Sequence, residues 1–319
     1  MRNFASVHDV DDIQALVQSA IDLKKDPFAF ETLGKRKTIG LVFLNPSLRT
    51  RMSTQKAASN LGLNVMVMNM DKDGWALETE DGMMMNGNKA EHIREAAAVL
   101  GQYCDIIGLR SFPKLHNREE DYSENILKKM ISFSGTPIVS LETATRHPLQ
   151  SLADLVTIIE FSKDIQNRKP KVVLSWAPHI KPLPQAVANS FAEWMLKADV
   201  DFVITHPEGY ELAPEFAQNA TINYNQDEAL LDADFVYVKN WSSYTDYGKI
   251  LSTDKNWMLT NKKLYRTSNA QVMHCLPVRR DVELAADVLD GQNSIVIQQA
   301  GNRVWAAQAV LKNILESNF

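Results

Sequence analysis

The stretch TIGLVFLNPSLRTR, residues 38–51, decides the fold class. Its first half, residues 38–44, is a short apolar run, which is typical of a parallel strand buried on both faces. The residues after Pro46 predict a helix that continues to about Leu61, and Gly62 is a suitable stop for it. A strand that turns directly into a helix is the repeating unit of an α/β fold.

The same alternation recurs along the whole chain. Further strands are predicted at 64–70, 105–110 and 137–142, and a second series at 171–176, 201–206, 235–240, 271–277 and 294–299. Helical patterns lie between many of them, for example at 90–103, 148–162 and 184–198. Repeated strand–helix alternation implies right-handed crossovers and parallel sheets. We therefore expect an α/β protein with two doubly wound domains.

The domain boundary is expected near a helix at 148–163. Residues 1–147 would form the first domain and residues 148–300 the second, while the last helix, within 301–319, would pack back on the first domain. The least regular stretch, residues 71–92, is predicted to be a long loop. Long loops inside compact domains are often functional.

The composition excludes several classes of protein. Of the 319 residues, 45% are hydrophobic and 23% charged, as in ordinary globular proteins. The net charge of −5 gives no general attraction to nucleic acid or to an anionic membrane, so an anion site must be built locally. No apolar run approaches the length of a membrane span, and the acidic start lacks the apolar core of a signal peptide. Two cysteines, Cys104 and Cys275, cannot form a disulfide framework, which favours the cytoplasm.

The start of the first predicted helix is a candidate phosphate site. A helix N-terminus presents free backbone N–H groups and the positive end of its dipole. Ser47 and Thr50 can add hydroxyl donors, and Arg49 can add a bidentate guanidinium. Arg110 ends one predicted strand and Arg303 follows another, where a cation is well placed for an anionic ligand. The alternative is a capped helix with solvated arginines and no ligand.

Polar residues also surround the start of the helix at 148–163. Pro148 fits the first helical turn, so that His147 stands at the helix entrance and Gln150 one turn inside. An imidazole and a carboxamide at this place can bind a carbonyl oxygen. A histidine before a helix is also a common cap or packing residue.

The stretch HCLP, residues 274–277, ends another predicted strand. Pro277 withholds an N–H and forces an irregular turn, which can leave the carbonyls of Cys275 and Leu276 to accept hydrogen bonds from a ligand amine. Adjacent His274 and Cys275 lack the usual spacing of metal ligands. A nucleophilic Cys275 is a further interpretation, but the sequence offers it no clear nearby base.

Three motifs together resemble one family. SLRTR at 47–51, HPLQ at 147–150 and HCLP at 274–277 occur in the order and at the separations of the aspartate/ornithine carbamoyltransferase family. The resemblance covers essentially the whole chain. It implies a carbamoyltransferase-like fold, with a carbamoyl-phosphate domain followed by an acceptor domain, and a homotrimer with shared active sites. It implies no metal and no other cofactor.

The resemblance also implies roles for single residues. Those implied to bind carbamoyl phosphate are Ser47, Leu48 (through its backbone), Arg49, Thr50, Trp75, Arg110, His147, Gln150 and Arg303. Those implied to bind the acceptor are Glu142, His179, Lys239, Cys275, Leu276, Arg279 and Ala90. The expected catalytic residues are Arg49, Arg110, His147, Cys275 and Arg303.

The sequence departs from the ornithine enzymes of this family where they bind the free α-amino group. Lys239 takes the place of an acidic residue, and a lysine repels an ammonium but attracts a carboxylate. Arg279 and Arg280 also suit a carboxylate. The resemblance places Ala90 where acetylornithine enzymes have a glutamate that narrows the acyl pocket, and Glu283 where they have a modified lysine. This pattern resembles the N-acylornithine branch, and the expected acceptor is N-succinyl-L-ornithine, which gives an N-acylcitrulline in arginine biosynthesis.

Three alternatives fit parts of the pattern. An NAD-dependent oxidoreductase shares the sheet pattern, but no two glycines are spaced as G-x-G. An acetylornithine or ornithine carbamoyltransferase differs only in details of the acceptor pocket. A non-catalytic ligand-binding paralogue would be expected to have lost motif residues, and the main ones are all present.

Overall fold

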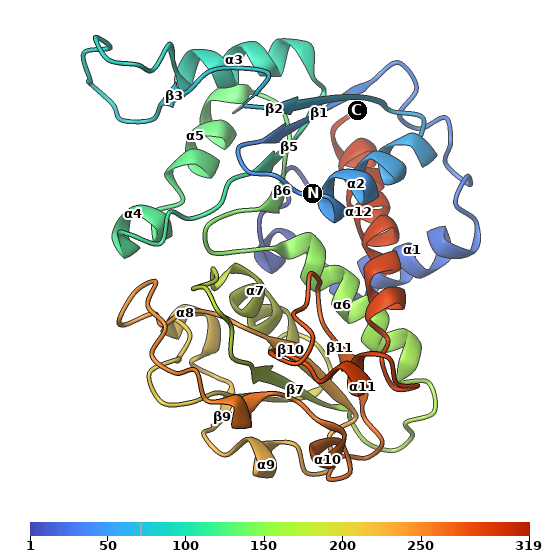
Figure 1. Cartoon of the computed structure of the whole chain (residues 1–319). Coiled ribbons are helices and arrows are strands. Elements are labelled where there is room, and N and C mark those ends of the chain that lie inside the picture. Colours follow the sequence, from blue (N-terminus) through green and yellow to red (C-terminus); the bar gives the residue numbers. More distant parts are fainter. Residues whose placement is uncertain (71) are drawn as a thin grey trace. The chain divides into compact units, whose positions relative to one another are not determined.

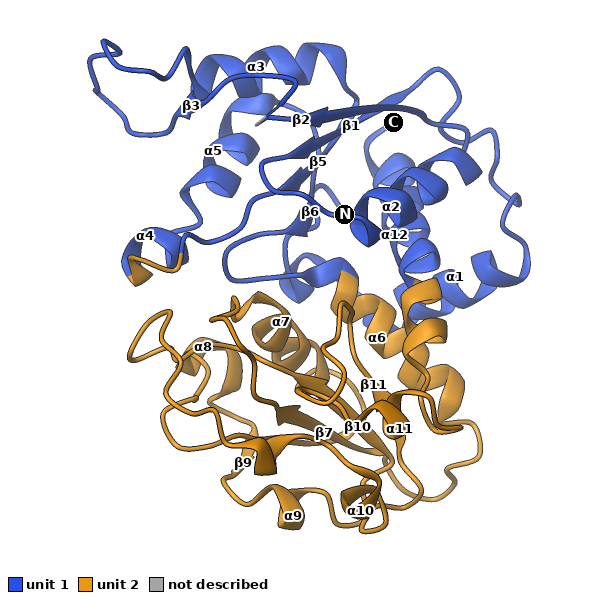
Figure 2. Cartoon of the chain, viewed as in Figure 1, with its two compact units in different colours: residues 1–114, 119–149, 303–319 blue, residues 115–118, 150–302 orange. Residues whose placement is uncertain are grey.

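The computed structural model describes residues 1–70 and 72–319 of the chain. They form two compact units, which Figure 2 shows in different colours. Unit 1 contains residues 1–114, 119–149 and 303–319, and unit 2 contains residues 115–118 and 150–302. Three helices contain residues of both units: α4 (Arg118–Tyr122), α6 (Pro148–Phe161) and α12 (Val296–Asn318). Each unit is an α/β structure on a parallel sheet, which confirms the predicted fold class.

Unit 1 is built on a four-stranded sheet with the strand order β2-β1-β5-β6 (Figure 1). Its strands are β1 (Thr38–Phe43), β2 (Asn64–Asn69), β5 (Ile106–Arg110) and β6 (Ile138–Glu142). The other helices of unit 1 are η1 (Val7–Asp9), α1 (Ile13–Lys25), α2 (Arg49–Asn60), α3 (Ile93–Tyr103) and α5 (Asn125–Ser134). Strands β5 and β6 are buried throughout, which explains why their sequences are continuously apolar instead of alternating.

The strand order of unit 1 indicates where a ligand binds. The chain passes from β1 to its neighbour β2 and then returns to β5 on the other side of β1. Ligands of open α/β sheets bind beyond the carboxyl ends of the strands where the order reverses, here at β1 and β5. Phe43 pairs with Arg110, and Arg110 pairs with Glu142, so the ends of three parallel strands share one edge.

Unit 2 is built on a five-stranded parallel sheet with the order β11-β10-β7-β8-β9. Its strands are β7 (Lys171–Trp176), β8 (Asp201–Thr205), β9 (Thr221–Asn223), β10 (Phe235–Lys239) and β11 (Gln271–Met273). Its other helices are α7 (Ala186–Met195), α8 (Pro214–Ala217), α9 (Gln226–Ala229), η2 (Lys255–Trp257), α10 (Asn261–Leu264) and α11 (Ala286–Leu289). The order reverses between β7 and β10, where Trp176 pairs with Lys239 at the carboxyl edge.

The predicted strand at 294–299 is wrong, because α12 already begins at Val296. Val296, Gln299 and Arg303 are buried at spacings of three and four residues, as on one face of a helix. Ile297, in the middle of the apolar run, is 71% exposed. Arg303 therefore lies inside a helix and not at a turn between a strand and a helix.

The segment predicted as a long loop lies in unit 1. Its first residue, Asp71, lies outside the described residues. The remainder contains two short strands, β3 (Leu77–Glu78) and β4 (Glu91–His92), which pair in parallel. Figure 1 shows the chain between β3 and β4 as an extended loop beside α3.

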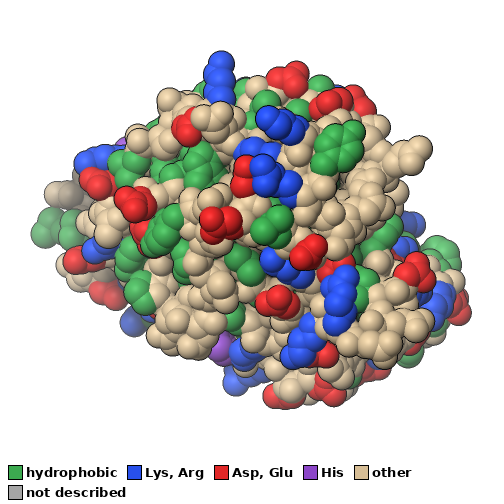
Figure 3. All heavy atoms as spheres, turned by 90° about the horizontal axis from the view of Figure 1, so that it is seen from below, with side chains coloured by type: hydrophobic (Ala, Val, Ile, Leu, Met, Phe, Trp, Pro, Cys, Tyr) green, Lys and Arg blue, Asp and Glu red, His purple; other side chains and the backbone are tan. Residues whose placement is uncertain are grey.

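The distribution of surface charge and the polarity of the helices agree with the expectations from the composition. On the face shown in Figure 3, acidic and basic side chains are interspersed and do not gather into a patch of one sign. Within residues 1–70 and 72–319, no helix is both long and apolar enough to span a bilayer.

Candidate active site

The phosphate candidate is the N-terminus of α2 in unit 1. The helix begins at Arg49, and Leu48 at the N-cap position provides no side-chain hydrogen bond to the first turn. The first N–H groups of the helix are therefore available to an anion. The Leu48 side chain is exposed, which suits a contribution through its backbone. The Nε atom of Arg49 is buried and has no hydrogen-bond partner within the described residues, and an anion beside Ser47 would provide one.

Arg303 of α12 joins this helix start. Its guanidinium donates a hydrogen bond from Nη2 to Oγ1 of Thr50, and both residues are buried. The structure thus brings Arg303 to the start of α2, although the two residues are distant in the sequence. A buried guanidinium beside an open helix N-terminus adds positive charge where a phosphate would bind.

Three further candidate residues meet at the carboxyl edge of β5 and β6. Arg110 donates a hydrogen bond from Nη1 to Oε2 of Glu142, and its guanidinium lies 4.2 Å from the centre of the Phe112 ring. The Nε2 atom of His147 lies 3.4 Å from the same Glu142 oxygen. All three candidates are almost completely buried. Because β5 neighbours β1, this group lies at the same sheet edge as the turn that leads into α2.

His147 is neutral at physiological pH. Burial lowers its pKa well below the ordinary value of a histidine, and the positive charges of Arg303 and Arg110 lower it further. A neutral imidazole carries one N–H donor and one acceptor. His147 can therefore bind an uncharged carbamoyl group by hydrogen bonds and leave charge stabilisation to the arginines.

The segment that carries Glu142 and His147 is held by Glu124, a residue that the sequence analysis missed. Oε1 of Glu124 accepts hydrogen bonds from Oγ1 of Thr143 at 2.8 Å and from the backbone N and Oγ1 of Thr145 at 2.7 Å each. Glu124 itself precedes α5 in a left-handed conformation, with φ of 51°. No local sequence pattern predicts a side-chain contact of this kind between distant segments.

A cavity of about 300 Å³ adjoins the phosphate candidate in unit 1. It is lined by Pro46, Ser47, Leu48, Arg51, Asn69 and Lys72. Arg51 and Lys72 give this lining a positive charge, and Arg51 donates a hydrogen bond to Oδ1 of Asn69 at 3.3 Å. The cavity therefore suits a polar or anionic group that approaches the helix start from outside.

Trp75 and Ala90 lie together at the base of the long loop. The backbone N of Ala90 bonds to the carbonyl of Ala76 at 3.2 Å, and Nε1 of Trp75 donates to Oε2 of Glu91 at 2.9 Å. The Trp75 side chain is nevertheless 54% exposed. It is therefore not packed into the arginine-rich group of its own chain.

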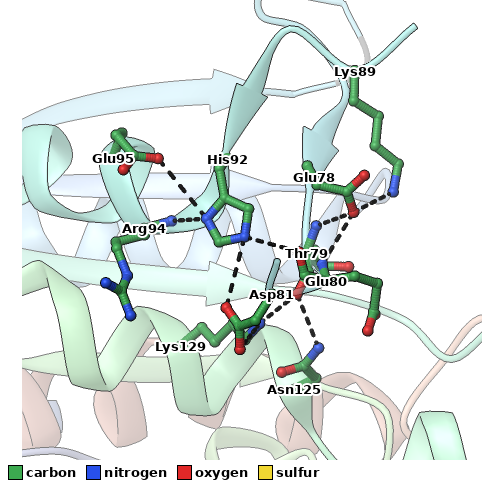
Figure 4. A network of polar contacts seen from close by, with 10 residues as sticks. All are labelled: Glu78, Thr79, Glu80, Asp81, Lys89, His92, Arg94, Glu95, Asn125 and Lys129. Carbon is green, nitrogen blue, oxygen red and sulfur yellow. Dashed lines mark hydrogen bonds and ion pairs between the residues drawn. The ribbon is translucent and has the colours of Figure 1, made fainter. Parts of the chain in front are cut away.

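Charged side chains fix the conformation of this loop (Figure 4). Glu78 accepts hydrogen bonds from two backbone N–H groups and from Nζ of Lys89 at 2.8 Å. The bond from Lys89, with the backbone bonds, lowers the pKa of Glu78 to about 2. From α5, Lys129 bonds to the carbonyl of Thr79 and lies 3.0 Å from Oδ2 of Asp81. The loop is thus anchored at both ends by these contacts.

In unit 2, the predicted acceptor residues gather at the carboxyl edge of the sheet. His179 follows β7, Lys239 ends β10, and Cys275 and Leu276 follow β11, and these three strands are neighbours. Lys239 and Cys275 are buried. Gln150, in the first turn of α6, is buried in this unit as well.

Arg279 reaches His179 from the turn after β11. Its Nε atom donates to Nε2 of His179 at 3.1 Å. Because an arginine N–H can only donate, Nε2 of His179 is the acceptor of this bond, and Nδ1 on the other side of the ring lies 2.8 Å from the carbonyl oxygen and 3.0 Å from the backbone N of Lys181. The bond uses Nε of Arg279, which leaves its two Nη groups for a carboxylate.

Arg280 differs from Arg279. Both of its Nη atoms bind the carboxylate of Asp290, at 2.6 and 2.8 Å. Because Asp290 engages the guanidinium of Arg280, Arg279 is the better candidate of the two for the acceptor carboxylate.

Glu283 contacts residues on both sides of the HCLP turn. It lies 3.4 Å from Nε2 of His274, and its other oxygen accepts a hydrogen bond from the backbone N of Arg279 at 2.9 Å. Burial raises the pKa of Glu283, but the hydrogen bond from His274, the charge of Lys239 and the bond from the backbone N of Arg279 outweigh burial and lower it to about 2. Nδ1 of His274 accepts from the backbone N of Leu276 at 2.9 Å. Both imidazole nitrogens are engaged, so His274 is not a base for the neighbouring thiol.

Two family models match the chain. The carbamoyl-P binding domain of aspartate/ornithine carbamoyltransferase matches residues 2–160, and the Asp/Orn binding domain matches residues 184–314. The chain belongs to the aspartate/ornithine carbamoyltransferase family. This confirms the resemblance of the three motifs, and the chain is a carbamoyltransferase.

Individual relatives of this carbamoyltransferase are similar over their whole length. The chain is 53% identical to an N-succinylornithine carbamoyltransferase of Bacteroides fragilis, over 99% of both chains. It is 34% identical to an N-acetylornithine carbamoyltransferase of Xanthomonas campestris pv. campestris, over 94% of this chain and 93% of the relative. A crystal structure of an N-acetyl-L-ornithine transcarbamylase, in which a glutamate is replaced by alanine, is complexed with carbamyl phosphate and N-succinyl-L-norvaline. It covers 98% of this chain and 100% of its own, with 33% identity and a TM-score of 0.93.

Proposed function

We propose that this carbamoyltransferase moves the carbamoyl group of carbamoyl phosphate to the side-chain amine of N-succinyl-L-ornithine, as a step of arginine biosynthesis. One observation carries the carbamoyl-phosphate part. At one edge of the unit 1 sheet, the open N-terminus of α2 and Arg303 lie beside Arg110 and the neutral His147. Cations and helix N–H groups suit a phosphate, and a neutral imidazole suits an uncharged carbonyl group.

The reaction is a nucleophilic addition followed by an elimination, without a covalent intermediate on the enzyme. The neutral δ-amine attacks the carbamoyl carbon, a C–N bond forms, and the carbonyl oxygen becomes negative in a tetrahedral intermediate. The bond from carbon to the phosphate oxygen then breaks, and the leaving phosphate takes the proton of the amine. Arg49, Arg110 and Arg303 stabilise the developing charge, and His147 with Gln150 orients the carbamoyl group. In unit 2, the carbonyls of the HCLP turn orient the amine.

The charges of unit 2 favour an acceptor with a masked α-amine and two carboxylates. The buried Lys239 and the Nη groups of Arg279 are positive, and a free ammonium would be repelled by Lys239. Ala90 is small and therefore leaves room for a longer acyl group. In support, the acetylornithine enzyme that holds N-succinyl-L-norvaline carries alanine in place of a glutamate. The relative from Bacteroides fragilis is an N-succinylornithine carbamoyltransferase.

We also propose a homotrimer in the cytoplasm, with each active site completed by a neighbouring subunit. Leu48, Met52 and Met66 expose apolar side chains on α2 and on the edge strand β2, close to the charged cavity. Trp75 and Met84 expose apolar side chains on the long loop. An exposed apolar sheet edge is uncommon in monomers and is a natural contact surface. The loop of one subunit would enter the cavity of the next and bring Trp75 and Ala90 to its site.

Phosphate release tests the proposal. The purified protein is supplied with carbamoyl phosphate and, in parallel, with succinylornithine, acetylornithine or ornithine. Succinylornithine is expected to give the highest kcat/KM, and the product should be the matching N-acylcitrulline. A preference for acetylornithine would overturn the acyl assignment, and no turnover with any of the three would overturn the proposed acceptor class.

A further inference from the structure

A chain of buried polar groups crosses unit 2. Nε2 of Gln150 donates to Oδ1 of Asp154 at 2.8 Å, and Nε2 of Gln299 donates to the same oxygen at 2.7 Å. The backbone N of His274 then donates to Oε1 of Gln299 at 2.9 Å. All four residues are at most 1% exposed. The series therefore runs from α6 through α12 to the end of β11 without a solvent-exposed member.

The chemistry of the groups fixes their orientations. A carboxylate oxygen can only accept, so both glutamines must turn their amide nitrogens toward Asp154. Gln299 consequently presents its oxygen to the N–H of His274. A flip of either amide would set an oxygen against a carboxylate and leave a buried donor without an acceptor, which is costly. Gln150 is thus held with its carboxamide in one of its two possible orientations.

The residues at the two ends of the series are assigned to different substrates. Gln150 belongs to the group proposed for carbamoyl phosphate. His274 directly precedes Cys275 and Leu276, whose carbonyls are proposed to orient the attacking amine. The backbone N of Leu276 is bound to Nδ1 of His274, so the position of His274 also sets the position of the turn.

We propose that Asp154 and Gln299 are positioning residues that fix the carboxamide of Gln150 and the HCLP turn relative to each other. Both are assigned to act through their hydrogen bonds to Gln150 and His274. Asp154 accepts hydrogen bonds from both Gln150 and Gln299, whereas Gln299 binds the backbone N of His274. This proposal rests on the proposed function, because that function assigns Gln150 and the turn to the site.

Asn302 provides a matched control on the same helix. It is buried, and its Nδ2 donates to Oγ1 of Thr157 at 2.9 Å and to Oε2 of Glu160 at 2.8 Å. Like Gln299, it is an amide of α12 that bonds to a side chain of α6. Its two partners on α6 are Thr157 and Glu160, which lie further along that helix than Asp154, the partner of Gln299.

The experiment compares Gln299→Leu with Asn302→Leu in the full-length enzyme. Gln299→Leu should raise KM for the acylornithine and lower kcat, with a loss of about ten-fold or more in kcat/KM, as expected for one buried hydrogen bond. KM for carbamoyl phosphate should stay the same, since Gln150 keeps its bond to Asp154. Asn302→Leu should stay within about two-fold of the wild type in both constants. Asp154→Leu should raise KM for both substrates. If Asp154→Leu does not fold, the comparison of Gln299→Leu with Asn302→Leu is sufficient to test the proposal.

Hydrogen exchange gives a readout that does not depend on activity. The amides of His274 and Leu276 should exchange faster in Gln299→Leu than in Asn302→Leu and the wild type. Equal losses of activity in the two variants, or unchanged exchange at residues 274–277, would overturn the proposal. If the wild-type protein shows no carbamoyl transfer, the proposed function is wrong. The exchange measurement would then still show whether Gln299 holds the turn at residues 274–277.

Discussion

Nε2 of His147 lies 3.4 Å from Oε2 of Glu142, and Arg110 donates a hydrogen bond to that same oxygen. The carboxylate is therefore neutralised by a permanent cation on one side and contacts an imidazole on the other. Burial, together with the charges of Arg303 and Arg110, lowers the pKa of His147 well below its ordinary value. The site thus concentrates its positive charge in guanidinium groups, which do not titrate at physiological pH.

A neutral, buried His147 makes the fold sensitive to mild acid. Below about pH 6.5 the histidine of the unfolded chain takes up a proton. The folded protein takes it up only at lower pH, so stability should fall as the pH drops from about 6.5, by up to about 1.4 kcal/mol per pH unit for this one group. His147→Gln removes the titrating group and should flatten this dependence. Urea unfolding between about pH 7.5 and pH 5.5 measures the free energy of unfolding.

His116 supplies the control for this measurement, because its side chain is exposed to solvent. His116→Gln should show the same slope of stability against pH as the wild type. If the wild type and His147→Gln have equal slopes below about pH 6.5, the assignment of a neutral His147 in the folded protein is wrong.

Arg49→Ala should abolish turnover while the fold stays intact. The substitution removes a guanidinium from the first residue of α2, where it is proposed to bind the phosphate of the substrate. Loss of a bidentate, charge-assisted contact of about 3 kcal/mol or more corresponds to roughly a hundred-fold or greater loss in kcat/KM. The same assay with Lys56→Ala is the control, since Lys56 is an exposed cation further along the same helix and lies over the ring of Phe28. Near-normal activity of Arg49→Ala would rule out the phosphate assignment.

The residues at strand ends could be predicted because parallel strands bring their carboxyl ends to one edge. Arg110 ends β5 and Glu142 ends β6, and the strand pairing places them in contact. A sequence pattern of buried strands is enough to predict this juxtaposition, and the same holds for Lys239 at the end of β10. Local patterns thus located most of the candidate residues without any knowledge of their distances.

Residues that act across long sequence distances could not be predicted in this way. Glu124 binds Thr143 and Thr145 through side-chain contacts that leave no periodic trace. The wrong strand at 294–299 has a different cause: its β-branched residues favour a strand locally, but the tertiary packing of α12 overrides that preference. Asp154 did have a usable signal, because a carboxylate stands four residues after Gln150 in a helix that is largely apolar.

Shared active sites predict complementation between two inactive variants. Trp75→Ala should disable the loop that enters a neighbouring site, and Arg49→Ala should disable the phosphate site itself. Subunits of both kinds, mixed and allowed to exchange, should regain part of the wild-type activity, because some sites receive Arg49 from one chain and Trp75 from another. A mixture of Arg49→Ala with His147→Ala is the control and should stay inactive, since both residues are proposed to serve the same site from the same chain, so that every site lacks one of them. No recovery in the first mixture, despite proven exchange of subunits, would count against a shared site.

The choice of acyl group is expected to depend on Ala90. The unmodified enzyme should prefer succinylornithine over acetylornithine by about ten- to hundred-fold in kcat/KM, because the second carboxylate adds one charge-assisted contact worth roughly 1.5–3 kcal/mol. Ala90→Glu should reverse this preference, since a carboxylate would fill the pocket and repel the succinyl group. Ala90→Gln has nearly the same volume without the charge, and it should reduce the preference for succinylornithine without reversing it. The comparison separates volume from charge: equal behaviour of the two variants would show that space alone decides. If neither variant changes the ratio of the two kcat/KM values, Ala90 does not face the acyl group.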